Sequence, residues 1–204
     1  DDYVNSTPTS RPLSESMTDF EVGYKLQGKK LFANLNLYSM DYKNQLILTG
    51  AINDVGAAVR TNVASSYRRG LELSCGVQLL KNLTWTGNAT FSQNKIVEFT
   101  EFIDDWDTWG QVETKYSNTD IAFSPNVIAG SQFTYRAVSS EKYGDLEVGL
   151  ISKYVGSQYI DNTSNNDRKL DAYFVNDFRV QYSVKTKIFS EIIWSAWIRN
   201  FLNE

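Results

Sequence analysis

The amino-acid sequence predicts an all-β protein, an antiparallel transmembrane β-barrel segment of about eight strands. Three observations carry this prediction. Apolar residues recur at every second position in segment after segment, which is the periodicity of strands rather than of helices. The predicted strands commonly run for 10 to 13 residues, whereas strands of soluble proteins usually have about 5–6. The connections between them alternate between short and long, as they do in outer-membrane barrels.

The clearest element is a long hairpin formed by residues 70–80 and 83–92. Every odd position from Leu71 to Phe91 that belongs to these two segments is apolar or small. The even positions from Gly70 to Gln78 and from Thr84 to Ser92 are small or polar. Lys81-Asn82 joins the two segments, which is the length of a tight hairpin turn. The hairpin therefore has one apolar face and one polar face.

Six further segments show the same alternation. They are residues 19–26, 31–42, 126–136, 146–154, 174–182 and 191–199. In the second of them the phase slips at Tyr38, Met40 and Tyr42, which predicts either a β-bulge or a strand that leaves its apolar surroundings.

The connections fall into two groups by length. The short ones are residues 27–30, 80–82, 137–144 and 185–188, and the long ones are residues 43–66, 97–122 and 157–170. In outer-membrane barrels the short turns are periplasmic and the long loops are extracellular, so we expect the same sidedness here.

Aromatic and polar residues agree with a membrane barrel. Six aromatic residues lie near predicted strand ends, where an amphipathic ring is favoured at a membrane–water boundary: Tyr38, Tyr42, Tyr67, Trp85, Tyr135 and Tyr182. The polar positions include ionic side chains such as Glu72, Glu147, Lys153 and Arg179. Such groups need pairing inside a small barrel, so a wide barrel is favoured.

Composition excludes several classes of function. The chain has a formal net charge of −4 and no basic run, so we expect no nucleic-acid partner. It has no His and one Cys, which removes the commonest general base and the commonest metal ligand. We therefore predict that it is not an enzyme and holds no cofactor or metal. No apolar run reaches the length of a transmembrane helix, but a barrel strand is shorter and needs only alternate apolar residues.

Several ordered motifs resemble those of TonB-dependent outer-membrane receptors. The resemblance covers nearly the whole chain. Its motifs are residues 17–24 (MTDFEVGY), 35–44 (LNLYSMDYKN), 69–73 (RGLEL), 118–125 (NTDIAFSP), 154–163 (YVGSQYIDNT) and 200–203 (NFLN). Each motif is weak alone, and their succession at plausible spacing is specific. The motifs are most similar to the iron-complex branch of Bacteroidetes-like bacteria.

This resemblance implies a part of a much larger machine. The family's barrel has 22 strands and is closed by an N-terminal plug, so residues 1–204 would be a C-terminal portion without the plug or the last strand. The parent would lie in the outer membrane of a Gram-negative bacterium, among its lipids. It would import a scarce small molecule such as a siderophore, and would contact the TonB complex through an N-terminal region outside this chain.

The candidate ligand contacts lie in residues 99–109, which mix aromatic and acidic side chains. We expect Phe102, Asp104, Asp105, Trp106 and Trp109 to reach a ligand, because loops on a rigid scaffold are where binding usually occurs. Acidic residues there also offer oxygen ligands for Ca²⁺, but the spacing and the glycine of an EF-hand are absent. The turn-rich residues 161–168 are expected to form a tight hydrogen-bonded loop.

Two other readings of the same strands remain open at this point. Eight strands are enough to close a small outer-membrane barrel, which would act as an adhesin or a structural protein. A soluble ligand-binding barrel is the third possibility, and the long strands and the asymmetric loops count against it.

Overall fold

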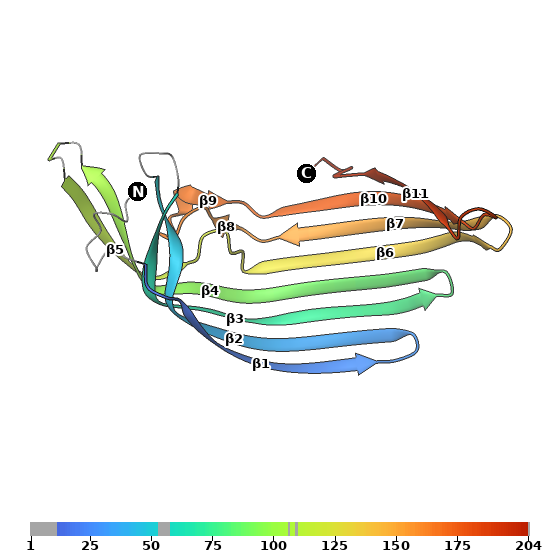
Figure 1. Cartoon of the computed structure of the whole chain (residues 1–204), viewed down its shortest axis with the longest axis horizontal. Coiled ribbons are helices and arrows are strands. Elements are labelled where there is room, and N and C mark those ends of the chain that lie inside the picture. The colour runs from blue at the N-terminus through green and yellow to red at the C-terminus, as the bar shows by residue number, and fades with distance from the viewer. Residues whose placement is uncertain (1–11, 53–57, 106, 109, 204) are drawn as a thin grey trace.

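The computed structural model describes residues 12–52, 58–105, 107–108 and 110–203, and its main feature is a nine-stranded antiparallel sheet (Figure 1). The strands of the sheet are β1 (Ser16–Gln27), β2 (Leu31–Ile52), β3 (Ala58–Leu80), β4 (Leu83–Asp105), β5 (Gly110–Asp120), β6 (Val127–Ser140), β7 (Gly144–Val155), β10 (Tyr173–Val184) and β11 (Ile192–Ile198). Their order is β1-β2-β3-β4-β6-β7-β10-β11, with β5 paired to the far end of β4. A small second sheet pairs β8 (Gln158–Tyr159) with β9 (Lys169–Leu170), and a 3-10 helix, Asn166–Arg168, lies between them.

The eight strands along this path correspond to the eight predicted segments, so the all-β antiparallel prediction is confirmed. The predicted two-residue turn at Lys81-Asn82 is present between β3 and β4. In the described residues, no helix is long and apolar enough to cross a membrane.

Strand register gives the sheet an apolar face and a polar face. Leu73 lies opposite Leu35 on β2 and opposite Ala89 on β4, so apolar residues align across three strands. The neighbouring Glu72 lies opposite Asn36 and Thr90 on the other face. Because strand side chains alternate between faces, this register extends the two faces across the sheet.

The apolar face has no layer of protein over it. A compact 23.2 kDa protein would expose about 9,700 Å² of surface, whereas this chain exposes 14635 Å². Six hydrophobic residues are buried among the described residues, and five of them form one cluster at an end of the sheet. The large side chains of the apolar face, such as Phe20, Leu37 and Phe133, remain exposed. A contiguous exposed apolar surface of this extent marks an interaction with lipid or protein.

The two ends of the sheet differ, as the connection lengths predicted. Short turns gather at one end, on the right in Figure 1, and the long connections gather at the other. The prediction that residues 43–66 and 97–122 are loops is wrong in its detail. Strands β2 and β3 continue into the first region, while β4 and β5 pair through most of the second, so both are hairpins that extend beyond the body of the sheet. Backbone pairing within each hairpin satisfies the polar groups that an irregular loop would leave to water.

For β2, the predicted bulge and the predicted boundary position of Tyr38 and Tyr42 are wrong, whereas the alternative that the strand leaves its apolar surroundings stays a prediction. Its pairing with β3 runs in constant register from Leu31 to Lys43, so there is no bulge at Tyr38–Tyr42. The apparent slip arises because Tyr38, Met40 and Tyr42 lie on the polar face with Asn36, and not at a lipid boundary. Tyr67, Trp85, Tyr135 and Tyr182 do lie on the apolar face.

The aromatic residues on the polar face cover glycines of β3. Tyr38 lies opposite Gly70 and Phe32 lies opposite Gly76, and each ring occupies the place that a Cβ atom at the glycine would take. An aromatic side chain over a cross-strand glycine restores the packing that the missing side chain would supply. These positions therefore need glycine because of close side-chain approach.

Candidate functional site: the hairpin cluster at the long-connection end

The sheet splits at its long-connection end. Pairing between β3 and β4 ends at Ser66 and Ile96; beyond these residues β3 pairs with β2 alone and β4 pairs with β5. We call the β2–β3 hairpin from residue 44 to 66, the β4–β5 hairpin from 97 to 120 and the connection from 156 to 172 the hairpin cluster. The split leaves two separate hairpins. The side chains at their bases must either pack against each other or stay exposed to water.

A small hydrophobic core fills the base of the hairpin cluster. Its members are Ile47, Val63, Ile96, Phe99 and Ile121, each 6% exposed or less, with Tyr116 packed against them. The Phe99 and Tyr116 rings are stacked with centroids 6.3 Å apart. These residues come from both hairpins and from the segment after β5, so burial of their side chains holds the two hairpins and this segment together.

The side chain of Asn162, in the 156–172 connection, joins the β2–β3 hairpin to the segment after β5. Its Nδ2 donates to the carbonyl of Leu48 on β2 at 2.6 Å. Its Oδ1 accepts from the backbone N–H of Ala122, the second residue after β5, at 2.8 Å. Asn162 is 2% exposed, so both ends of a buried amide are satisfied by backbone groups, one in the β2–β3 hairpin and one in the segment after β5.

An ionic network lies beside this amide. One nitrogen of the Arg168 guanidinium, Nη1, donates to Glu101 Oε1 at 2.9 Å and to Asp161 Oδ2 at 2.6 Å. The Tyr116 hydroxyl donates to the other oxygen of Glu101 at 2.9 Å. Hydrogen bonds to Asp161 and Glu101 raise the pKa of Arg168, and the hydrogen bond to Glu101 raises the pKa of Tyr116. The network thus keeps one cation and two carboxylates bound between the connection and the β4–β5 hairpin.

Ser164 makes a third link between the connection and β5. Its hydroxyl accepts from the backbone N–H of Asp120 at 2.7 Å and donates to the carboxylate of the same residue at 3.2 Å. Lys95 on β4 forms an ion pair with Asp120 at 2.9 Å.

The connection is also tied to itself, as predicted for residues 161–168. The Asp161 carboxylate accepts from both the backbone N–H and the hydroxyl of Thr163. The side chain of Asn165 accepts from the N–H of Asp167 and caps the 3-10 helix. These short-range bonds are the turn chemistry of Asp, Asn, Ser and Thr, and they confirm the tight loop.

Acidification below about pH 4 should loosen the connection. Partial burial raises the pKa of Asp161, but hydrogen bonds from Arg168 and Thr163 outweigh it, and the net pKa is lowered. A carboxylate with a lowered pKa contributes stability above its ordinary value of about 4, and loses that contribution as the pH falls through the lower folded value. Exchange of the Thr163 amide hydrogen, relative to an unstructured peptide, should therefore accelerate below about pH 4.

The control for this pH dependence is Asp161→Asn. The variant has no titrating carboxyl at this position, so Thr163 should exchange faster at neutral pH and show little further acceleration on acidification. An equally steep acid response in the variant would contradict the assignment to Asp161.

The predicted ligand contacts lie at the far end of the β4–β5 hairpin. Phe102 is on β4 and 51% exposed. Asp105 is the last residue of β4, and its carboxylate accepts from the Thr108 hydroxyl at 2.7 Å and from the Asp107 N–H at 3.0 Å. These hydrogen bonds lower the pKa of Asp105. Asp104 is in β4, beside Asp105, while Trp106 and Trp109 lie outside the described residues.

Strand alternation divides these contacts between two faces of the hairpin. Phe102 lies opposite Glu113, and Glu101 and Ile103 lie on the other face with Thr114 and Val112. Asp105 is four residues after Glu101 on the same strand and therefore lies on the face of Glu101, not on the face of Phe102. The proposed ligand residues do not all converge on one surface of the strand.

Sequence reasoning missed the roles of Asn162 and Arg168. The Asp-Asn-Thr-Ser run around Asn162 signals a turn and nothing more. The partners of Asn162 are 114 and 40 residues away, and no local pattern encodes a pairing at that separation.

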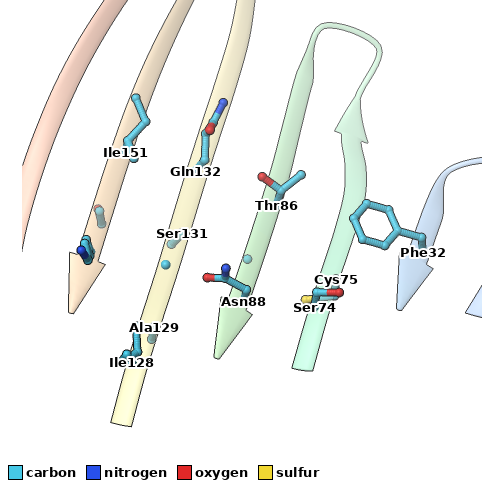
Figure 2. A pocket seen from close by; sticks show the side chains of 14 residues that line it. Phe32, Ser74, Cys75, Thr86, Asn88, Ile128, Ala129, Ser131, Gln132 and Ile151 are labelled. Atoms are coloured by element: carbon cyan, nitrogen blue, oxygen red, sulfur yellow. The ribbon is translucent and has the colours of Figure 1, made fainter. Parts of the chain in front are cut away.

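Among the open hollows of the polar face in the described residues, two are larger than a third that lies over β2, β3 and β4. One, of about 460 Å³, is shown in Figure 2, where Phe32, Thr86, Gln132 and Ile151 stand on the same face of four strands. The other, of about 430 Å³, lies beneath the residues that join β5 to β6. There Arg68 donates to Ser124 Oγ at 3.2 Å and to Asn94 Oδ1 at 3.4 Å.

No group of three or more metal-ligating side chains occurs in the described part of the chain. The Ca²⁺ reading of the acidic residues at 101–107 therefore finds no support among the side chains whose positions are described.

This geometry defines a class of protein. An antiparallel sheet with one uncovered apolar face, one polar face, short turns at one end and long hairpins at the other is the wall of a membrane β-barrel. The family described as "TonB dependent receptor-like, beta-barrel" matches residues 2–201, and the chain belongs to this family. Comparison with curated protein sequences finds no match.

Solved structures of similar fold include two receptors for ferric complexes and a copper transporter. The ferric yersiniabactin uptake receptor FyuA from Yersinia pestis aligns with a TM-score of 0.65 at 16% identity over 93% of this chain and 25% of that one. BauA, the ferric preacinetobactin receptor from Acinetobacter baumannii, gives 0.66 at 16% identity over 92% and 25%. The copper transporter OprC gives 0.67 at 18% identity over 96% and 26%.

The chain spans about a quarter of the length of these neighbours. At such identities the likeness shows the fold. The family and its structural neighbours are receptors and transporters, not enzymes, which confirms the prediction that this chain is not an enzyme.

Proposed function

We propose that this chain forms part of the barrel wall and the extracellular hairpins of a TonB-dependent receptor that imports a small ligand across the outer membrane of a Gram-negative bacterium. The observation that carries the proposal is the uncovered apolar face, which needs a non-aqueous partner along most of the sheet. Lipid of the outer membrane supplies such a partner. The family membership supports the remaining parts of the proposal.

The sheet is open, which favours a barrel larger than this chain. β1 and β11 lie at opposite ends of the strand order and do not pair with each other. A small closed barrel of eight strands would pair them, so neither the adhesin reading nor the soluble-barrel reading is favoured. Unpaired strand edges are an association hazard unless neighbours cover them, and further strands of the same receptor would do so. Residues 1–204 would then be a C-terminal portion of the barrel domain.

The ligand class that we propose is a metal complex such as a ferric siderophore. The names of two structural neighbours specify ferric complexes and that of a third specifies copper. Energy would come from the TonB complex, which would contact a region of the parent outside this chain. The Bacteroidetes-like branch stays a prediction.

Uptake by the full-length receptor tests this proposal. Cells that express it as their only such receptor should accumulate radiolabelled ferric yersiniabactin, ferric preacinetobactin or copper(II), and a TonB deletion should abolish the accumulation. Accumulation that is equal with and without TonB would overturn the proposal.

The ligand-contact assignment is tested by Phe102→Ala. Loss of an aromatic ring that the ligand would cover should raise the half-saturating concentration for uptake by up to about tenfold, because an aromatic contact is worth roughly 0.5–1.5 kcal/mol. Ile103→Ala is the matched control, since Ile103 is 48% exposed on the opposite face of the same hairpin. Equal effects of the two substitutions would mean that ligand contact does not depend on the Phe102 face.

A further inference from the structure

We propose that Asn162 and Arg168 are positioning residues that lock the three parts of the hairpin cluster into one rigid unit, which presents the β4–β5 hairpin to the ligand and stays intact through the uptake cycle. This inference rests on the proposed receptor function. The inference specifies which extracellular segments move together, and it names the two side chains that hold these segments to one another.

Buried contacts join the three segments. Asn162 is almost fully buried, and its amide connects β2 to the segment after β5. An Asn whose Nδ2 and Oδ1 are both bonded to backbone groups cannot release either hairpin without leaving a buried polar group unsatisfied, which carries a large desolvation penalty. Separation of the β2–β3 hairpin from the β5 end is thereby opposed.

The connection is held to the β4–β5 hairpin at two different places. Arg168 bonds Glu101 close to the end of β4, and Ser164 bonds Asp120 at the end of β5. Two separated attachments fix both the position and the angle of a hairpin, whereas a single attachment would leave it free to pivot. The hydrophobic core at Ile96 and Phe99 lies between them.

The connection is itself stiff. Within it, the backbone N–H groups of Thr163, Asp167 and Arg168 are all bonded to nearby residues of the same connection, and a short 3-10 helix is capped by Asn165. A stiff brace that contacts both hairpins transmits displacement from one to the other. Movement of one part of the hairpin cluster against the rest therefore requires several of these bonds to break together.

The first experiment compares two asparagines of the same connection in the full-length receptor. Asn162→Ala removes the cross-hairpin amide, and Asn165→Ala removes a cap whose bond stays inside the connection. The inference expects Asn162→Ala to accelerate amide hydrogen exchange on all three segments of the hairpin cluster and to raise the half-saturating concentration about tenfold, with the maximal rate unchanged. Asn165→Ala should affect exchange only at residues 165–168.

The second experiment locks the unit covalently. A D120C/S164C pair in a Cys75→Ser background places two thiols where the Ser164 hydroxyl now meets the Asp120 carboxylate at 3.2 Å. The inference expects the oxidised receptor to take up radiolabelled ferric complex as fast as the reduced one.

The outcomes separate this inference from the receptor function. Uptake that is lost on oxidation and recovered on reduction would show that the segments must separate, and would overturn the inference. Equal exchange profiles for Asn162→Ala and Asn165→Ala would also overturn it. If the reduced receptor takes up no probe complex, the proposed function fails, while the exchange comparison still decides whether the hairpin cluster is one unit.

Discussion

Replacing Leu73 by arginine should destabilise the folded barrel by about 2–4 kcal/mol, the cost of a cation near the midplane of the membrane on the lipid face. Leu73 lies on the apolar face between Leu35 and Ala89, in the middle of the β3–β4 pairing that runs from Ser66 to Leu80. No neighbouring carboxylate on that face is placed to pair with the new charge. We expect reduced assembly in the outer membrane and a lower midpoint of denaturant unfolding in lipid vesicles.

Glu72→Arg is the matched control for that substitution. Glu72 precedes Leu73 at the same depth but belongs to the polar face, where it borders a hollow with Arg68 and Tyr38. A charge there faces water or other protein, so the same residue type should change the unfolding midpoint far less. Two equally severe variants would contradict the assignment of the faces, and with it the membrane orientation of the whole sheet.

Substitution of Gly76 by valine should cost about 1–3 kcal/mol through overpacking. The Phe32 ring occupies the space that a Cβ atom at Gly76 would need, so the ring or the strand must shift. The effect should appear as a lower unfolding midpoint of the receptor in vesicles, with correct membrane insertion retained.

The double variant Phe32→Ala/Gly76→Val makes this prediction specific. Removal of the ring opens the space that valine needs, so the two substitutions together should cost less than the sum of their separate effects. Residues in direct contact commonly show coupling of about 0.5–3 kcal/mol. Strict additivity would mean that the cost of valine comes from the backbone of β3 and not from Phe32.

Both predictions depend on register, and the sequence predicted much of it. The alternation in residues 70–80 and 83–92, together with the two-residue turn at Lys81-Asn82, determined which side chains share a face. The same signal located the other six strands of the path. Side-chain alternation with a period of two leaves little freedom in the pairing register once one face must be apolar. A slip of one residue would exchange the two faces.

The same rule failed where aromatic residues stand on the polar face. Tyr38, Met40 and Tyr42 suggested a change of phase, yet β2 keeps its register through them. Tyr38 is on the polar face because Gly70 across the strand leaves room for its ring. Hydrophobicity alone cannot distinguish a ring that faces lipid from a ring that fills the space over a glycine.

The sequence by itself determined the all-β architecture, the two faces, the short-turn and long-connection ends, and the family. These are local properties, since each follows from residues next to each other in the chain. Only the tertiary structure decided that residues 43–66 and 97–122 are paired hairpins, and that Asn162 and Arg168 join them to the 156–172 connection. The reason is physical: the buried amide of Asn162 is satisfied by partners 40 and 114 residues away, and the Arg168 guanidinium reaches Glu101, 67 residues away. These meetings depend on how the sheet splits at Ser66 and Ile96.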